Sequence, residues 1–278
     1  MYKNILLALD GSDMDTNIIE MGLFLAKKLD AKLHGLHVQD ENLLEGPLMY
    51  DISGALAFIP QLNFLKETRK VMEEKALNLL EGFRSECKKN NVACETISLS
   101  GNVAKIICDQ AELHDLTIIG RRGLHYKFDK ELIGSTTDRV VRHTRAPILV
   151  MTHEFEALQN PLISFDGSHT SKKALKTAAH LGTDLKLPLT VLHVSSDKAE
   201  SKTVLSEAQT SLDNYPLMVK YEHASGNPHE AVAQYAKKHK HDVVIIGARG
   251  HRGILDFILG STTQYVLWSG AFHVLVDR

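Results

Sequence analysis

Two stretches of the chain combine closely spaced glycines with a pair of hydroxyl residues, each directly after an apolar run. One of them, "IIGARGHRGILDFILGST" (245–262), contains Gly247, Gly250, Gly253, Gly260, Ser261 and Thr262. Glycine allows tight turns with positive φ, and it also lets bare backbone lie against a ligand. Backbone N–H groups at the start of a helix bind anions, above all phosphate. The stretch is therefore either a set of turns or a phosphate-binding loop.

The same pattern occurs earlier in the chain, at Gly120, Gly123, Gly134, Ser135 and Thr136. Glycine spacing alone is weak evidence of binding, and its recurrence strengthens the phosphate interpretation. Neither stretch is a Walker A loop or a G-x-G-x-x-G dinucleotide motif. Ten residues separate Gly123 from Gly134 but nine separate Gly250 from Gly260, and the added residue either bulges outward or shifts the phosphate cradle. Nearby basic residues could neutralise the charge of a phosphate, but we expect them to be solvated: Arg121, Arg122 and Lys127 in one loop, Arg249 and Arg252 in the other.

Two aspartates each follow an apolar run, in "NILLALDGS" (Asp10) and "PLISFDGS" (Asp166). In an open parallel sheet, ligands bind beyond the carboxyl ends of strands, where a carboxylate can hold ribose hydroxyls. An aspartate or serine before a helix also caps orphan N–H groups. The two roles are compatible, and both stay open for these aspartates.

No catalytic constellation is apparent in the sequence. We expect His37 and His193, in "LHV", to pack or hydrogen-bond at strand ends rather than act as bases. The pairs His34 with His37 and His239 with His241 lack cysteine or carboxylate companions at metal-site spacing, so no metal site is predicted.

The chain contains an internal duplication, because six sequence blocks recur in the same order. Examples are "SGNVAKIICDQA" (100–111) with "SGNPHEAVAQYA" (225–236), and "DLTIIGRRG" (115–123) with "DVVIIGARG" (242–250). We place one domain at 1–152 and the other at 160–278. The first half carries 29 more residues between its aspartate and its glycine block, mostly within 40–70. That segment is interpreted as an elaborated surface loop or, alternatively, as a lid or partner face.

Short β-branched runs alternate with helical patterns in each half, which predicts an α/β fold with an open five-stranded parallel sheet flanked by helices. In the second half, strands are expected near 161–165, 188–194, 217–223, 242–246 and 272–277. Helices are expected at 170–182, 198–213, 228–239 and 260–268. The duplication suggests that the halves pair through their final strands, "PILVM" and "HVLVD".

Bulk composition excludes several classes of protein. With 32 basic and 34 acidic residues, no strong field favours nucleic acid or an anionic membrane as a partner. No apolar run is long enough to span a bilayer. The three cysteines are odd in number and confined to the first half, which favours a reducing cytoplasm over a disulfide framework.

Taken together, strand-"DGS", "SGN" before a helix and G-x2-G-x9-G-[ST] before the last strand resemble the universal stress protein family, present as two tandem domains. The resemblance covers nearly the whole chain except 40–70 and the linker. It implies Rossmann-like domains of the flavodoxin type that bind ATP or another adenine nucleotide, with or without Mg²⁺, in a dimer or tandem pseudo-dimer.

The resemblance also implies which residues hold the nucleotide. In the second half, phosphates and ribose would contact Gly247, Gly250, Gly260, Ser261 and Thr262, Asp166 would lie near the nucleotide, and the backbone of Val194 would meet adenine. The first half offers Asp10, Val38, Gly120, Gly123, Gly134, Ser135 and Thr136. Because its ten-residue spacing departs from the nine residues of the family pattern, we rank the second site above the first. We expect a nucleotide-dependent stress-response regulator with an unknown protein partner; the alternatives are a slow ATPase or adenylate-handling enzyme, and a ligand-free scaffold.

Overall fold

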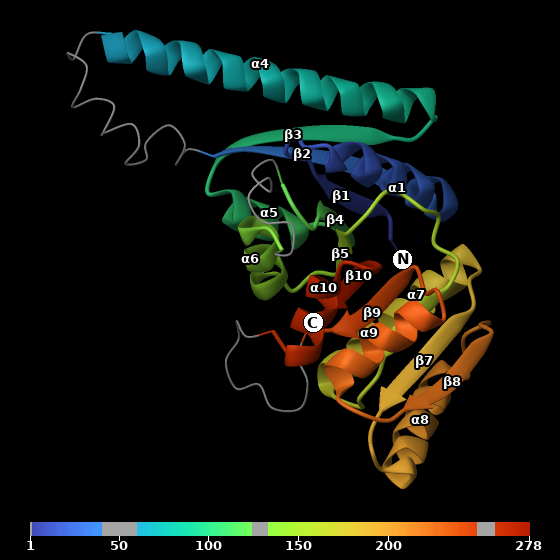
Figure 1. Ribbon diagram of the computed structural model, residues 1–278. Coiled ribbons are helices and arrows are strands. Elements are labelled where there is room, and N and C mark those ends of the chain that lie inside the picture. The colour runs from blue at the N-terminus through green and yellow to red at the C-terminus, as the bar shows by residue number, and fades with distance from the viewer. Residues whose placement is uncertain (1, 41–59, 124–132, 249–258) are drawn as a thin grey trace.

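The computed structural model describes residues 2–40, 60–123, 133–248 and 259–278, and within 60–66 it describes the backbone only. Each half follows one order of elements (Figure 1). The first half contains β1 (Asn4–Ala8), α1 (Met14–Leu29), β2 (Lys32–Asp40), α4 (Pro60–Lys89), β3 (Cys94–Gly101), α5 (Val103–Ala111), β4 (Leu116–Gly120), α6 (Ser135–His143) and β5 (Ile148–Met151). The second contains β6 (Pro161–Ser164), α7 (His169–Leu185), β7 (Leu189–Val194), α8 (Lys198–Leu212), β8 (Val219–Ala224), α9 (Pro228–Lys238), β9 (Val243–Gly247), α10 (Ser261–Ser269) and β10 (His273–Asp277).

The strands form one sheet in the order β3-β2-β1-β4-β5-β10-β9-β6-β7-β8. Pairing is parallel within each half, and the halves meet through antiparallel β5 and β10, where Leu149 lies opposite Leu275. The predicted parallel sheets and their junction through the final strands are confirmed. In Figure 1, β5 and β10 lie between the blue-to-green half and the yellow-to-red half.

Helices cover both faces of the sheet. Successive strand residues point to opposite sides, so apolar strands place a core on each face. In β1, Ile5 and Leu7 face one core, into which α1, α4, α7 and α8 pack. Leu6 and Ala8 face the other core, which includes residues of α5, α6, α9 and α10. Each core contains residues from both halves of the chain.

The segment 40–70 differs in part from the prediction. The loop interpretation is wrong for 60–70, because these residues form the first turns of α4, a 30-residue helix whose counterpart α8 has 15 residues. Pro60 is the first residue of α4, where the missing N–H of proline costs no hydrogen bond. Residues 41–59 lie outside the described residues. Within the described chain, no helix is both long and apolar enough to cross a bilayer.

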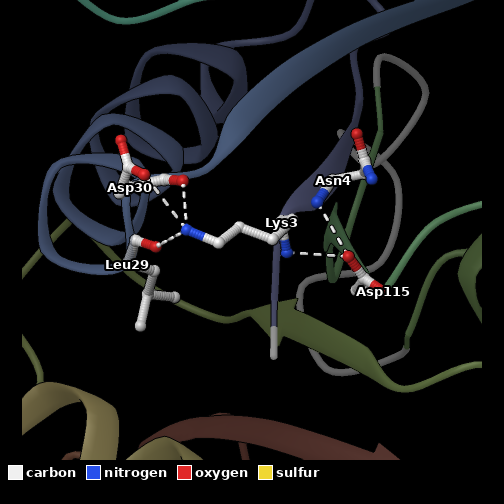
Figure 2. A network of polar contacts seen from close by, with 5 residues as sticks. All are labelled: Lys3, Asn4, Leu29, Asp30 and Asp115. Atoms are coloured by element: carbon white, nitrogen blue, oxygen red, sulfur yellow. Dashed lines mark hydrogen bonds and ion pairs between the residues drawn. The ribbon is translucent and has the colours of Figure 1, made fainter.

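A polar network fixes the amino-terminal end of β1, opposite the edge where the predicted site lies (Figure 2). Lys3 Nζ donates to the carbonyls of Leu29 and Asp30 and to the carboxylate of Asp30, at the end of α1. Asp115 Oδ2 accepts the backbone N–H groups of Lys3 and Asn4, at 2.7 and 2.8 Å. These contacts hold β1 between α1 and the start of β4.

Candidate functional site

A cavity of about 430 Å³ lies at the carboxyl ends of β1, β2 and β4. The order β3-β2-β1-β4-β5 reverses direction between β1 and β4, which is where open α/β sheets bind ligands. All seven residues predicted for the first half line this cavity: Asp10, Val38, Gly120, Gly123, Gly134, Ser135 and Thr136. They come from four stretches that are well separated in the sequence.

Asp10 is held at the cavity mouth by its own turn and by a glycine of the neighbouring loop. Its Oδ1 accepts the N–H of Ser12 at 3.0 Å. A methyl group at Gly123 would overlap Asp10 Oδ2, so glycine lets this carboxylate keep its position. Gly123 thus serves close approach, the second of the two uses of glycine considered above.

Sequence analysis missed Asp15, a buried carboxylate beneath Asp10. Asp15 is 5% exposed and accepts the N–H groups of Asp10 and Gly11, at 3.2 and 2.7 Å. Burial, and secondarily the charge of Asp10, raise the pKa of Asp15 to about 7 despite these two hydrogen bonds. The duplication gave no hint of this role, because Ser171 stands at the matching position of the second half.

The start of α6 forms the wall where the sequence predicts a phosphate group. The N–H of Gly134 donates to the carbonyl of Arg121 at 2.8 Å, and Thr137 Oγ1 donates to the carbonyl of Gly120 at 2.7 Å. These bonds fix Ser135 and Thr136 in the first turn of a nine-residue helix. The first N–H groups of a helix lack intrahelical acceptors, so this turn presents donors and a partial positive charge.

The two arginines after β4 are not simply solvated, and that expectation is corrected. Arg122 is half-buried and lines the cavity, where its charge can complement an anion. Arg121 is buried and turns away toward the second half of the chain. Lys127, Arg249 and Arg252 lie outside the described residues.

The remaining walls are mostly apolar and include Ile18, Leu36, Val103, Ile107 and Ile119. β2 runs on to Asp40, which pairs with Gly101 of β3, and so adds Gln39 and Asp40 to the lining. Sequence analysis missed these two residues, because the matching strand of the second half ends at Val194.

The predicted hydrogen bonds of the strand-end histidines are present in both halves. The ring of His37 bonds through Nδ1 to the carbonyl of Leu9 at 2.9 Å, and that of His193 bonds through Nδ1 to the carbonyl of Phe165 at 2.8 Å. Each histidine thus links neighbouring strands just beyond their paired residues.

The second half repeats the backbone framework of the site. Thr263 Oγ1 donates to the carbonyl of Gly247 at 2.8 Å, and the N–H of Gly260 donates to the carbonyl of Ala248 at 3.0 Å. Ser261 is exposed, while Gly260 and Thr262 are half-buried at the start of α10. Gly247 itself is required by packing, since a Cβ there would lie 2.7 Å from the backbone of Thr170.

The other residues predicted for the second-half site are Asp166, Val194 and Gly250. Asp166 is exposed, and its Oδ1 accepts the N–H of Ser168, whose own side chain caps α7 through the N–H of Ser171. Val194 is half-buried at the end of β7. Gly250 and Gly253 fall within 249–258, outside the described residues, so the preference for the second site over the first stays a prediction.

These features define a class of protein: a tandem α/β chain whose duplicated halves share one sheet, with a glycine-lined crevice at the strand switch point of the first half. Residues 1–152 and 197–278 match the sequence model of the Universal stress protein family. The chain therefore belongs to the universal stress protein family.

Two relatives and one solved structure show the extent of the similarity. The chain is 27% identical over 286 residues to universal stress protein Slr1230 of Synechocystis, spanning 99% of this chain and 100% of that protein. Universal stress protein YxiE of Bacillus subtilis is 28% identical over 153 residues, 54% of this chain and 99% of that protein. The crystal structure of a universal stress protein from Archaeoglobus fulgidus matches with a TM-score of 0.77 and 21% identity, over 99% of this chain and 98% of that one.

Proposed function

We propose that the chain binds an adenine nucleotide, ATP first of all, in the first-half cavity. The observation that supports this most is the convergence of seven predicted residues, from four separate stretches, on a single cavity at the strand switch point. A volume of about 430 Å³ falls within the usual range of small-molecule sites. In this proposal the chain is a stress-response regulator whose nucleotide state is read by a protein partner.

The lining of the cavity offers three kinds of chemistry. Apolar side chains such as Leu36 and Ile107, beside the backbone of Val38, suit a flat base. Asp10 suits ribose hydroxyls. Arg122 and the first turn of α6 suit phosphates, by charge and by N–H donors. Mg²⁺ would enter as the ion carried by the triphosphate.

A second nucleotide site in the second half is part of the same proposal. It would use Asp166, Val194, Gly247, Gly250, Gly260, Ser261 and Thr262. The repeated bonds from Thr263 to Gly247 and from Gly260 to Ala248 support it. We further propose a cytoplasmic location, with which the three free thiols agree.

Calorimetric titration with ATP and Mg²⁺ tests the proposal, with Gly123→Val as the informative variant. Any Cβ at Gly123 displaces Asp10, and the branched side chain enters the cavity. We expect binding by the unmodified chain and at least about a tenfold weaker affinity in the first site of the variant, or about 1.4 kcal/mol.

Gly82→Val is the matched control, because Gly82 lies in α4 with open space around its missing side chain. Valine is no worse than glycine in a helix, so this variant should bind as the unmodified chain does. Absence of heat from the unmodified chain would favour the ligand-free scaffold. Steady release of inorganic phosphate would instead favour the slow ATPase.

A further inference from the structure

The side chain of Arg121, which stands between two residues that line the cavity, reaches into the other half of the molecule. Arg121 directly follows β4 and is 7% exposed. Its Nη2 donates to the carbonyl of Trp268, in the last turn of α10. A methyl group at Gly270 would overlap Arg121 Nη1, and Gly270 has φ +63, so the helix ends in a glycine that makes room for the guanidinium.

The main chain of the same residue holds the cavity together. The N–H of Arg121 donates to the carbonyl of Met151 at 2.7 Å, and its own carbonyl accepts the N–H of Gly134. Its neighbours Gly120 and Arg122 line the cavity. Movement of Arg121 would therefore displace the start of α6 and the two flanking wall residues together.

The second half shows that the two main-chain hydrogen bonds of Arg121 do not depend on its side chain. Ala248 stands at the matching position and makes the same two main-chain bonds, to Asp277 at 2.7 Å and to Gly260 at 3.0 Å. Alanine has no side chain with which to reach the opposite half. The long side chain of Arg121 is thus not required for the backbone bonds, and its contact with α10 has no counterpart from Ala248.

The carbonyl of Trp268, at the end of α10, is a favourable acceptor for a buried cation. The last carbonyls of a helix lack intrahelical donors and carry a partial negative charge, so an arginine there is favourable. A buried guanidinium needs hydrogen-bond acceptors, and the carbonyl of Trp268 is one of them. The side chain is fixed to α10, while the next residue, Arg122, faces the cavity.

We propose that Arg121 is a positioning residue. By holding the end of α10, it keeps the loop Gly120–Gly123 and the start of α6 in the arrangement that receives phosphate. The second half of the chain thereby sets the nucleotide affinity of the first-half cavity. This inference rests on the proposed function. In this inference the duplication does more than supply two sites, because the second half holds the first-half cavity in its binding arrangement.

The test is photolabelling of the full chain with 8-azido-ATP and Mg²⁺, followed by peptide mapping, which separates first-half labelling from second-half labelling. Arg121→Ala installs the residue of the matching position and should keep the fold. We expect about tenfold weaker labelling of the first half, the size of effect that positions outside a site exert on binding. Arg121→Lys, which can reach a carbonyl but lacks the planar fork, should recover part of the loss.

A second variant approaches the same contact from the other half. Gly270→Ala overlaps the guanidinium and should also weaken first-half labelling, although Gly270 does not line the cavity. Gly226→Ala is the matched control, because Gly226 has φ +118 and open space, so alanine adds backbone strain without touching Arg121. It should leave first-half labelling unchanged.

The double variant Arg121→Ala/Gly270→Ala separates positioning from general destabilisation. If Gly270 acts only through Arg121, the double variant should be no weaker than Arg121→Ala alone. Labelling of Arg121→Ala within about twofold of the unmodified chain, or losses that add, would overturn the inference. If Arg121→Ala does not fold, first-half labelling of Arg121→Lys and Gly270→Ala is measured instead. Labelling of both variants within about twofold of the unmodified chain would then overturn the inference. Absence of labelling in the unmodified chain would overturn the proposed function, and this inference with it.

Discussion

At the scale of single residues, two neighbouring carboxylates have different environments, and one of them, Asp10, lines the cavity. Asp10 is half-buried and bonded to its own turn, whereas Asp15 lies beneath it, buried, and accepts two backbone N–H groups. Burial and the neighbouring charge of Asp10 both disfavour ionisation of Asp15. The turn that presents Asp10 therefore rests on a group that changes charge near neutral pH.

Asp15→Asn should flatten the pH dependence of stability between about pH 4 and pH 7. Because folding raises the pKa of Asp15 to about 7, the folded state keeps a proton that the unfolded state has lost across this range. The free energy of unfolding of the unmodified chain should then fall as pH rises through it, by up to about 4 kcal/mol from this one group. Urea unfolding at successive pH values measures the difference between the chain and its variant.

Asp13→Asn is the control for that measurement, because Asp13 is an exposed carboxylate only two residues away. Its profile should run parallel to that of the unmodified chain. An Asp15→Asn profile with the unmodified slope would show that Asp15 is ionised in the folded protein throughout this range.

Residue types and spacing predicted six of the seven first-half positions that meet at the cavity, because each belongs to a strand end or a helix start that a local pattern reveals. The seventh, Val38, was expected only from the resemblance to the universal stress protein family. The same patterns could not reveal Arg121 or Asp15. Burial of Arg121 depends on α10, which is more than 130 residues away along the chain, and Asp15 occupies a helical position where carboxylates are ordinarily solvated.

At the scale of elements, the alternation of short β-branched runs with helical patterns predicted the strands and helices of the second half closely. The secondary structure of the segment 40–70 was harder to predict. Gly46, Pro47, Gly54 and Pro60 suggested a loop, but a proline at the first position of a helix carries no penalty, and α4 begins there. A proline marks a boundary without showing on which side the helix lies.

The repeated "SGN" conceals a difference between α5 and α9 that yields a prediction. Asn102 Oδ1 accepts the N–H of Lys105 at 3.0 Å and caps α5, whereas Asn227 makes no side-chain cap to α9, which begins with Pro228. Asn102→Ala should lower the free energy of unfolding by about 1 kcal/mol, and Asn227→Ala by clearly less. Both asparagines are exposed, so each variant is the other's control. Equal shifts in the urea midpoint would contradict the assigned cap.

At the scale of the whole molecule, the halves share a sheet and both cores. One core joins Ile5 and Phe83 of the first half to Leu175 and Leu275 of the second. The antiparallel pairing of β5 with β10 places Leu149 opposite Leu275, and both side chains are buried in that core. Repeated domains that share so much apolar surface should not unfold independently.

Leu149→Ala tests this cooperativity, because the chain has a single tryptophan and it lies in the other half. Trp268 fluorescence reports the second half, while far-ultraviolet circular dichroism reports all helices and strands. Removing a buried leucine side chain should cost about 2–5 kcal/mol. If the halves unfold together, the fluorescence and dichroism midpoints in urea should fall by the same amount. A fluorescence midpoint that stays in place while part of the dichroism signal is lost earlier would show that the first half unfolds on its own, and that the β5–β10 junction does not couple them.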